Sequence, residues 1–271
     1  MTTGFELLAL PQGTKGLLLT GDDLGLCHAA NTAVFHHLQQ ASLTGASLIV
    51  PAPWAREAIV AYRGEPISVQ LAATAEHLVY SWGPITAAPS LHGGDGGFAS
   101  SVDDLLDHAD GDDLRREFRA QIERAVLWGF DVCGLTVHQD AALLRPEYFD
   151  VVLDLAVEFD LPLRLAERPD SDLGFPATLL AQQEGILTPD HTVRLSGEAT
   201  LMDVVRELQP GITEVIVTPA DDTGELRALA ADAEARVSSS EELQALTLPS
   251  GVVKLSWRDL RTAQRAARNN A

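Results

Sequence analysis

The stretch LLLTGDDLGLCHAAN, residues 17–31, decides how we interpret the fold of this chain. It places an apolar run, two adjacent carboxylates, a glycine and a helix-like pattern in direct succession. This order is typical of a βα unit, in which a buried parallel strand ends in a short turn that leads into a helix. We therefore expect a strand that ends near Thr20, a helix that begins near His28, and the carboxylates of Asp22 and Asp23 at the turn between them.

Short apolar runs and amphipathic stretches continue to alternate along almost the whole chain. The pattern predicts about eight βα repeats, which favour an α/β fold with one TIM-like, not necessarily regular, (β/α) barrel over residues 1–271. An open doubly wound sheet is less well supported, because the chain has no glycine-rich dinucleotide-binding motif. The expected strands are residues 16–20, 46–50, 67–71, 134–138, 161–165, 192–195, 214–217 and 252–255. The expected helices are residues 28–41, 53–62, 113–128, 146–159, 175–184, 199–208, 223–235 and 257–267.

Charge and composition limit the classes of partner. The chain has 19 Lys and Arg against 39 Asp and Glu, a formal net charge of -20, which disfavours nucleic acid and anionic membrane surfaces. Cys27 and Cys133 form no CxxC pair, so we expect two reduced, buried thiols, with a single disulfide left open. No run approaches the ~18 apolar residues of a membrane helix, and the N-terminus has no secretory pattern, so we expect a cytoplasmic protein.

One segment, residues 76–113, interrupts the βα rhythm with glycines, prolines and aromatic residues. It follows the third expected strand and would therefore lie over the carboxyl end of the barrel, where enzymes of this architecture bind substrate. Loops of this length are usually functional or mobile, so a disordered insertion remains the alternative.

Polar side chains at the carboxyl ends of the strands form the candidate site, because these ends meet at one face of a barrel. Adjacent carboxylates can divide the work of amide or ester hydrolysis, with one on a divalent cation and the other taking a proton from water. The alternative is that Asp22 or Asp23 caps the helix near His28. The residues at these ends are Asp22, Asp23, Gln70, Glu76, His138, Asp140, Arg164, Glu167, Thr218, Asp221 and Asp222.

The chain resembles a known family over nearly its whole length. TGDDLGLCHAAN, TAEHLVYSWGPITAAPSL, LTVHQD, VIVTPADD and LSWRDL are similar, in order and spacing, to segments of the YdjC-like (ChbG/HpnK) carbohydrate deacetylases. The resemblance implies a barrel-like βα fold and metal-dependent removal of N-acetyl groups from chito-oligosaccharides or related acetylated sugars.

The resemblance also implies roles for single residues. It makes Asp22 the group that activates the attacking water, and it places a divalent cation, Mg²⁺ or Zn²⁺, on Asp23, on position 70 and on His138. Position 70 is a histidine in the family and Gln70 here. Two further family residues, an aspartate and a histidine, are replaced by Thr136 and Thr218.

These departures weaken the expected metal site. An amide oxygen suits Mg²⁺ better than Zn²⁺, which prefers nitrogen and sulfur ligands. Asp140, two residues after His138, is a candidate substitute ligand. Candidate substrate-binding residues are Glu76, Tyr80, Trp82, Arg164 and Thr218, of which Tyr80 and Trp82 could stack on a sugar ring or only anchor the loop, and Arg164 could instead pair with Glu167 or Asp23.

Three functions therefore remain open. The first is a working metal-dependent deacetylase with a remodelled site. The second is a catalytically impaired homologue that binds an acetylated sugar or a similar small molecule. The third is a non-enzymatic interaction protein, such as a subunit of a homo-oligomer, that uses its acidic surface or the segment 76–113.

Overall fold

A computed structural model describes residues 7–8, 10–77, 79–94, 96–167, 169–195 and 199–269. Within them, seven parallel strands form one sheet. Six follow the order β4-β3-β2-β1-β6-β5, and β7 pairs with the first half of β1. The strands are β1 (Lys15–Leu24), β2 (Gly45–Leu48), β3 (Ile67–Leu71), β4 (Val132–Val137), β5 (His191–Arg194), β6 (Gly211–Val217) and β7 (Val252–Leu255).

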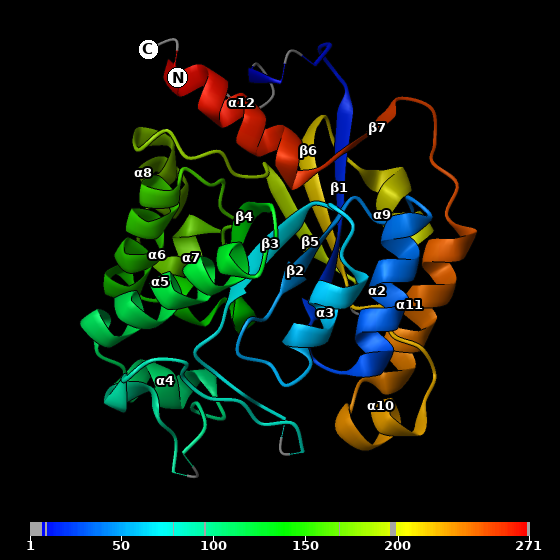
Figure 1. Ribbon diagram of the computed structural model, residues 1–271. Helices are drawn as coiled ribbons and strands as arrows, with labels where there is room; N and C mark the ends of the chain where they lie inside the picture. Colours follow the sequence, from blue (N-terminus) through cyan, green and yellow to red (C-terminus); the bar gives the residue numbers. More distant parts are fainter. Residues whose placement is uncertain are drawn as a thin grey trace.

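Helices surround the curled sheet (Figure 1). In that view α5, α6 and α8 lie to one side of the strands, α2 and α11 to the other, and α12 crosses the end where the strands begin. The α-helices are α2 (His28–Gln39), α3 (Ala55–Ala61), α4 (Val102–His108), α5 (Gly111–Leu127), α6 (Pro146–Phe159), α7 (Asp170–Leu173), α8 (Ala177–Gln183), α9 (Leu201–Glu207), α10 (Gly224–Leu229), α11 (Ala233–Ala245) and α12 (Trp257–Asn269). Two 3-10 helices, η1 (Pro89–Leu91) and η2 (His138–Leu143), complete the described elements.

The predicted parallel α/β, barrel-like fold is confirmed, with two corrections. The expected strand 161–165 forms only one bridge, Leu135 to Leu163, so β4 and β5 are the two edges of the described sheet. The expected helix 223–235 is two helices, α10 and α11. The sequence pattern missed this break because Ala230 and Asp232 do not disturb a helical pattern.

An irregularity in β1 sets the directions of the two adjacent carboxylates. Gly21 pairs with Ala46 and Leu24 with Leu48, so β1 has one residue more than β2 over this interval. Asp23 takes a positive φ of 63°, which aspartate tolerates better than most residues. Such a bulge redirects side chains that would otherwise alternate between the two faces of the sheet.

The opposite end of the barrel is closed by an apolar cluster. Trp257, at the start of α12, is 1 % exposed and packs with Leu18, Ile212 and Leu260. An added Cβ on Gly134 would come within 2.6 Å of the Trp257 ring, so this position requires glycine for the two to pack as they do. The indole therefore closes the barrel at the end opposite the polar residues, and we call this packed end the Trp257 floor.

The segment 76–113 contains η1, α4 and the start of α5, and residues 78 and 95 lie outside its described part. The segment is anchored to α5 by Glu117, whose carboxylate accepts hydrogen bonds from the backbone N–H groups of Ile85 and Thr86. The Trp82 ring meets the His138 ring edge to face, with centroids 5.8 Å apart. The prediction that this segment covers the carboxyl end of the barrel is therefore confirmed.

Two further expectations concern the thiols and the membrane. Cys27 and Cys133 are both free and buried, as predicted. In the part of the chain that the structure describes, no helix combines the length and apolar character that crossing a membrane requires.

Candidate functional site

Asp22 lies in a fully buried ion-pair network. Both of its carboxylate oxygens accept hydrogen bonds from Arg164, at 2.8 and 3.0 Å, and neither side chain is more than 1 % exposed. Arg164 also donates to Glu214 on β6 from Nε and Nη2, at 2.8 and 2.6 Å. Burial opposes the charge of Arg164, but Asp22 and Glu214 outweigh it and raise the pKa of the guanidinium. Its ion-pair partners are thus Asp22 and Glu214 rather than Glu167 or Asp23.

This network continues down to the floor of the barrel. Glu214 accepts a hydrogen bond from the Thr20 hydroxyl at 2.6 Å and from the Trp257 indole N–H at 3.2 Å. Arg164 therefore joins the Asp22 turn to β6, and Glu214 joins both to α12. The arrangement holds the barrel together and leaves Asp22 no free oxygen.

Asp23 faces a different set of partners, on the loop side of the site. Its backbone N–H donates to Gln70 Oε1 at 3.2 Å, and its Oδ1 accepts from Gln70 Nε2 at 3.3 Å. The same amide nitrogen lies 3.0 Å from Nδ1 of His138. Gln70 thus bridges Asp23 and His138, which are the two other residues on which the cation was expected.

A guanidinium occupies the remaining side of Asp23. Arg236 Nη2, from α11, donates to Asp23 Oδ2 at 2.8 Å. Burial alone would raise the pKa of Asp23, but the charge and hydrogen bond of Arg236, with the charges of His138 and Arg194, hold that pKa well below its usual range. Asp23 is therefore a carboxylate whose charge is already neutralised by the protein.

His138 is hydrogen-bonded through both ring nitrogens. Its Nε2 lies 2.9 Å from Glu76 Oε2, and its Nδ1 faces the Gln70 amide. The neutral ring that satisfies both contacts donates from Nε2 and accepts at Nδ1. Burial lowers the pKa of His138, but the hydrogen bond and charge of Glu76, with the charges of Asp23 and Asp22, outweigh it and raise that pKa.

Asp140 lies apart from these contacts. Its Oδ2 accepts from the backbone N–H of Glu167 at 3.2 Å, and burial raises its pKa. Glu167 in turn accepts from Arg194 Nε at 2.8 Å, and Arg194 Nη1 lies 3.6 Å from Asp22. Asp140 therefore belongs to the Glu167–Arg194 side of the site, and its use as a metal ligand stays a prediction.

The predicted substrate-binding residues lie in unequal positions. Glu76 is 30 % exposed at its side chain, whereas Trp82 is only 4 % exposed and packs against His138. The Tyr80 hydroxyl donates to Glu225 on α10 at 3.0 Å. Thr218 is half-buried directly after β6. Glu76, Tyr80 and Thr218 are thus the partly exposed members of this set, and no contact tests the role of Thr218.

The alternative that the aspartate pair caps the following helix is wrong. Both aspartates lie within β1, and the N-cap of α2 is Cys27, whose sulfur accepts from the Ala30 N–H at 3.4 Å. The turn is held instead by Asn31, which accepts from the backbone N–H of Gly25 at 2.7 Å. Neither carboxylate is therefore used as a helix cap.

The donor set does not fit the cation that the resemblance implies. The amide nitrogen of Gln70, which cannot ligate a metal, faces both Asp23 Oδ1 and His138 Nδ1. Turning the amide over would place its N–H groups against the backbone N–H of Asp23, which now donates to Oε1. Across the described residues, no group of three or more His, Cys, Asp or Glu side chains is arranged to hold a metal ion. We therefore derive no chemical step through a metal.

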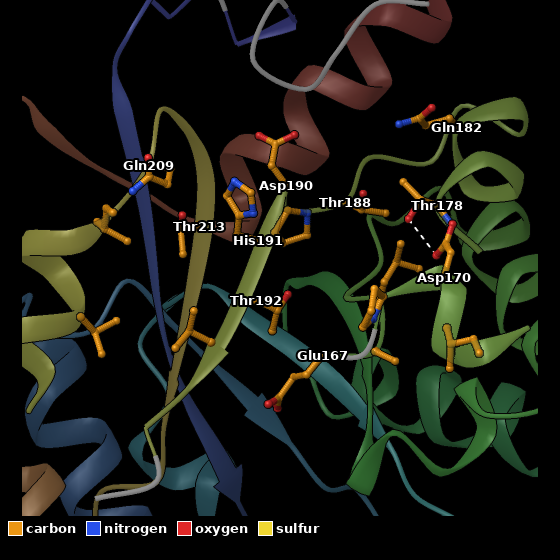
Figure 2. A pocket seen from close by; sticks show the side chains of 18 of the residues that line it. Glu167, Asp170, Thr178, Gln182, Thr188, Asp190, His191, Thr192, Gln209 and Thr213 are labelled. Carbon is orange, nitrogen blue, oxygen red and sulfur yellow. Dashed lines mark hydrogen bonds between the residues drawn. The ribbon is translucent and has the colours of Figure 1, made fainter. Parts of the chain in front are cut away.

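A cavity of about 630 Å³ lies elsewhere, between β5 and residues 165–173 (Figure 2). Its described lining includes Asp170, Asp190 and Thr213 but not Asp22, Asp23 or His138. Glu167 also lines it, so the cavity borders the Glu167–Arg194 side of the site without reaching the two aspartates or His138.

The sequence matches a family model over residues 16–252, described as YdjC-like protein. This chain belongs to the YdjC-like family. A carbohydrate deacetylase from Thermus thermophilus is 35 % identical over 184 residues, which is 67 % of this chain and 66 % of that relative. A second, from Thermoanaerobacter pseudethanolicus, is 25 % identical over 76 % of this chain and 81 % of its own.

The YdjC-like fold is also supported by a solved structure. A crystal structure from Enterococcus faecalis V583, described as a cellobiose-phosphate cleavage protein, superposes with a TM-score of 0.79. The match covers 91 % of this chain and 99 % of that one, at 20 % sequence identity. At this identity the likeness concerns the fold alone.

Three residues of this YdjC-like site were missed from the sequence. Arg194 ends β5 and could have been found by applying the strand-end rule to that strand as well. Glu214 could have been found as a charged residue inside an otherwise apolar strand. No local pattern marks Arg236, which meets Asp23 across 213 positions of sequence.

Proposed function

We propose that this chain binds a carbohydrate-like small molecule, an acetylated amino sugar or a close analogue, at the carboxyl end of its barrel, without metal-dependent deacetylation. The ligand class is supported by the names of its relatives, which are carbohydrate deacetylases. The absence of hydrolysis is argued from this chain's own contacts.

One observation carries the proposal, and it is the position of the Gln70 amide. It donates to Asp23 Oδ1 and faces His138 Nδ1. The two atoms that a cation would need are therefore already occupied by the same amide nitrogen. The other group required for hydrolysis, Asp22, has both oxygens on Arg164. Both carboxylates are paired with arginine, and Asp22, at zero exposure, has no access to an attacking water.

The surroundings of Glu76 offer room for part of a ligand. A cavity of about 240 Å³ is lined by Ala75 and His77, the sequence neighbours of Glu76, and by Phe98 among others, but not by Glu76 itself. His77 Nε2 lies 3.4 Å from Glu76 Oε1. Small-molecule sites are usually cavities of about 300–1,000 Å³ with a few convergent polar groups, so this smaller cavity suits only part of a ligand. Glu76 is the group that we expect to orient ligand hydroxyls.

Binding and hydrolysis are measured separately in the test. Calorimetry with di-N-acetylchitobiose should detect binding by the unchanged protein, and an acetate assay with added Zn²⁺ or Mg²⁺ should detect no release. Glu76→Gln should weaken binding about 5- to 20-fold, because one charged acceptor is lost. Glu158→Gln, on the outer surface of α6, is the matched control and should leave the affinity unchanged.

Two results would contradict the proposal. The first is acetate release by the unchanged protein that disappears in Asp22→Asn. The second is no detectable binding of the disaccharide at millimolar concentration.

A further inference from the structure

The guanidinium of Arg236 is the feature of the site that neither the family pattern nor the proposed function explains. It is 5 % exposed, and its Nη2 donates to Asp23 at 2.8 Å. Its Nε donates to both carboxylate oxygens of Asp232, at 2.9 and 3.0 Å. The third nitrogen, Nη1, is buried and has no hydrogen-bond partner among the described residues.

The fold holds this side chain in place. α11 packs against α2, beside β1, and a buried hydrogen bond of 2.8 Å joins His37 Nε2 to Ser240 Oγ (Figure 1). The backbone carbonyl of Arg236 also accepts from the N–H of Ala220, in the loop after β6. Arg236 is therefore presented to Asp23 by two contacts of its own helix, rather than by a flexible surface arm.

The position of Arg236 answers the electrostatic need that a cation would otherwise meet. Two adjacent carboxylates at a buried turn repel each other unless positive charge lies close to both. Arg164 supplies it to Asp22 and Arg236 to Asp23. A divalent cation on Asp23 would have to displace the guanidinium or share the carboxylate with it, at a strong repulsion.

The free N–H groups of Nη1 call for an oxygen acceptor, because a buried unpaired donor on a charged group is costly. That acceptor is better uncharged than anionic. Arg236 already pairs with two carboxylates, Asp23 and Asp232. An amide carbonyl or a hydroxyl adds no further negative charge.

We infer that Arg236 is a resident cation that takes the place of the divalent ion at Asp23 and donates from Nη1 to an uncharged oxygen of the ligand. The ligand half of this inference rests on the proposed function, whereas the cation half does not.

Metal binding tests the cation half without any sugar. Zn²⁺ affinity is measured by equilibrium dialysis for the unchanged protein, Gln70→His, Arg236→Met and the double variant. The double variant should bind at least 100-fold more tightly than Gln70→His alone, because only then are Asp23 and two imidazoles free together. Arg227→Met, an exposed arginine on α10 paired with Asp222, replaces Arg236→Met in the control double variant and should add nothing.

Two results would overturn the cation half. One is Zn²⁺ binding by Gln70→His that equals that of the double variant. The other is tight binding by the unchanged protein that Arg236→Met does not alter. Should Arg236→Met fail to fold, Arg236→Lys serves in its place: it keeps a charge, and it should lower Zn²⁺ affinity in the Gln70→His background relative to the same background with Arg236→Gln.

Calorimetry with di-N-acetylchitobiose tests the ligand half. Arg236→Lys should lose at least 10-fold in affinity, because a single ammonium nitrogen cannot occupy the three separate positions of Nε, Nη1 and Nη2, while Arg227→Met should lose none. Unchanged affinity in Arg236→Lys would overturn the ligand role of Arg236 and leave the proposed function standing. Absence of binding by the unchanged protein would contradict both the ligand role of Arg236 and the proposed function. The dialysis result would still decide the cation half.

Discussion

Asp22 and Asp23 are neighbours in sequence but belong to two different regions of the molecule. Asp22 faces inward to Arg164, Glu214 and the Trp257 floor, and its side chain is 0 % exposed. Asp23 faces Gln70 and Arg236, near the covering loop, and its side chain is 11 % exposed. The bulge in β1 separates the two directions. In sequence the two carboxylates resemble a single catalytic motif. In the structure Asp22 stabilises the scaffold, whereas Asp23 lies on the side that a ligand can approach.

Arg164→Met should produce the largest effect in this comparison. It leaves Asp22 and Glu214 buried without their main counter-ion, and breaking such a pair from one side costs about 3–5 kcal/mol. The measurement is the free energy of unfolding from urea titration. Arg227→Met, which breaks an exposed pair, should leave that free energy nearly unchanged. Equal losses of unfolding free energy in the two variants would mean that the buried pairs of Arg164 stabilise the fold no more than an exposed pair does.

Gly134→Ala should come second, because it tests the floor beneath the Asp22 network. The new Cβ would lie within 2.6 Å of the Trp257 ring, and overpacking of this kind costs about 1–3 kcal/mol. Gly111→Ala is the matched control, since an added Cβ there meets nothing within 4 Å. Unfolding free energies should fall in the first variant and stay level or rise slightly in the second. An unchanged unfolding free energy in Gly134→Ala would mean that the Trp257 ring can shift to make room for the added Cβ.

Asp22→Asn and Asp23→Asn compare the two carboxylates directly. Arg164 would keep only Glu214, at zero exposure, whereas Arg236 would keep Asp232, which is half exposed at its side chain. We expect Asp22→Asn to cost about 1 kcal/mol more in unfolding free energy than Asp23→Asn. The reverse order would contradict the division between scaffold and ligand surface.

The pH dependence of stability should show the smallest effect, and it concerns the Asp23 side. The pKa of His138 is raised by Glu76, so the stability from this pair is fully present below the unfolded histidine value of about 6.5. It is lost as the pH rises through the folded pKa, because the imidazolium is then deprotonated and its ion pair with Glu76 ends. Thermal melts from pH 5.5 to 9 should show this loss in the unchanged protein and a flatter profile in Glu76→Gln. Identical profiles would mean that Glu76 does not stabilise the imidazolium.

How far the sequence predicts this molecule depends on the range of each interaction. The strands and the polar residues at their ends follow from local periodicity, so the meeting of Asp23, Gln70 and His138 was correctly predicted. The bulge could not be predicted, because one extra residue leaves no trace in the hydrophobic pattern. Residues 161–165 have the composition of a strand, but pairing depends on a neighbour that the sequence does not specify.

The partners of the arginines were the least predictable part. Arg164 and Arg236 choose among many carboxylates, and the choice is made by distances between elements remote in sequence. The sequence at the strand ends predicts which charged groups meet at one face of the barrel, but it does not predict which of them form ion pairs with each other. That distinction decides here between a metal site and a closed set of ion pairs.

The Trp257 floor also changes where the functional unit ends. The family model covers residues 16–252, yet the indole that donates to Glu214 lies beyond them, on α12. A fragment cut at residue 252 would keep Asp22, Gln70 and His138 but lose the LSWRDL segment, and Gly134 and Thr20 would lose their contacts with the Trp257 indole. Expression and transplantation experiments should therefore carry α12 along with the matched segment.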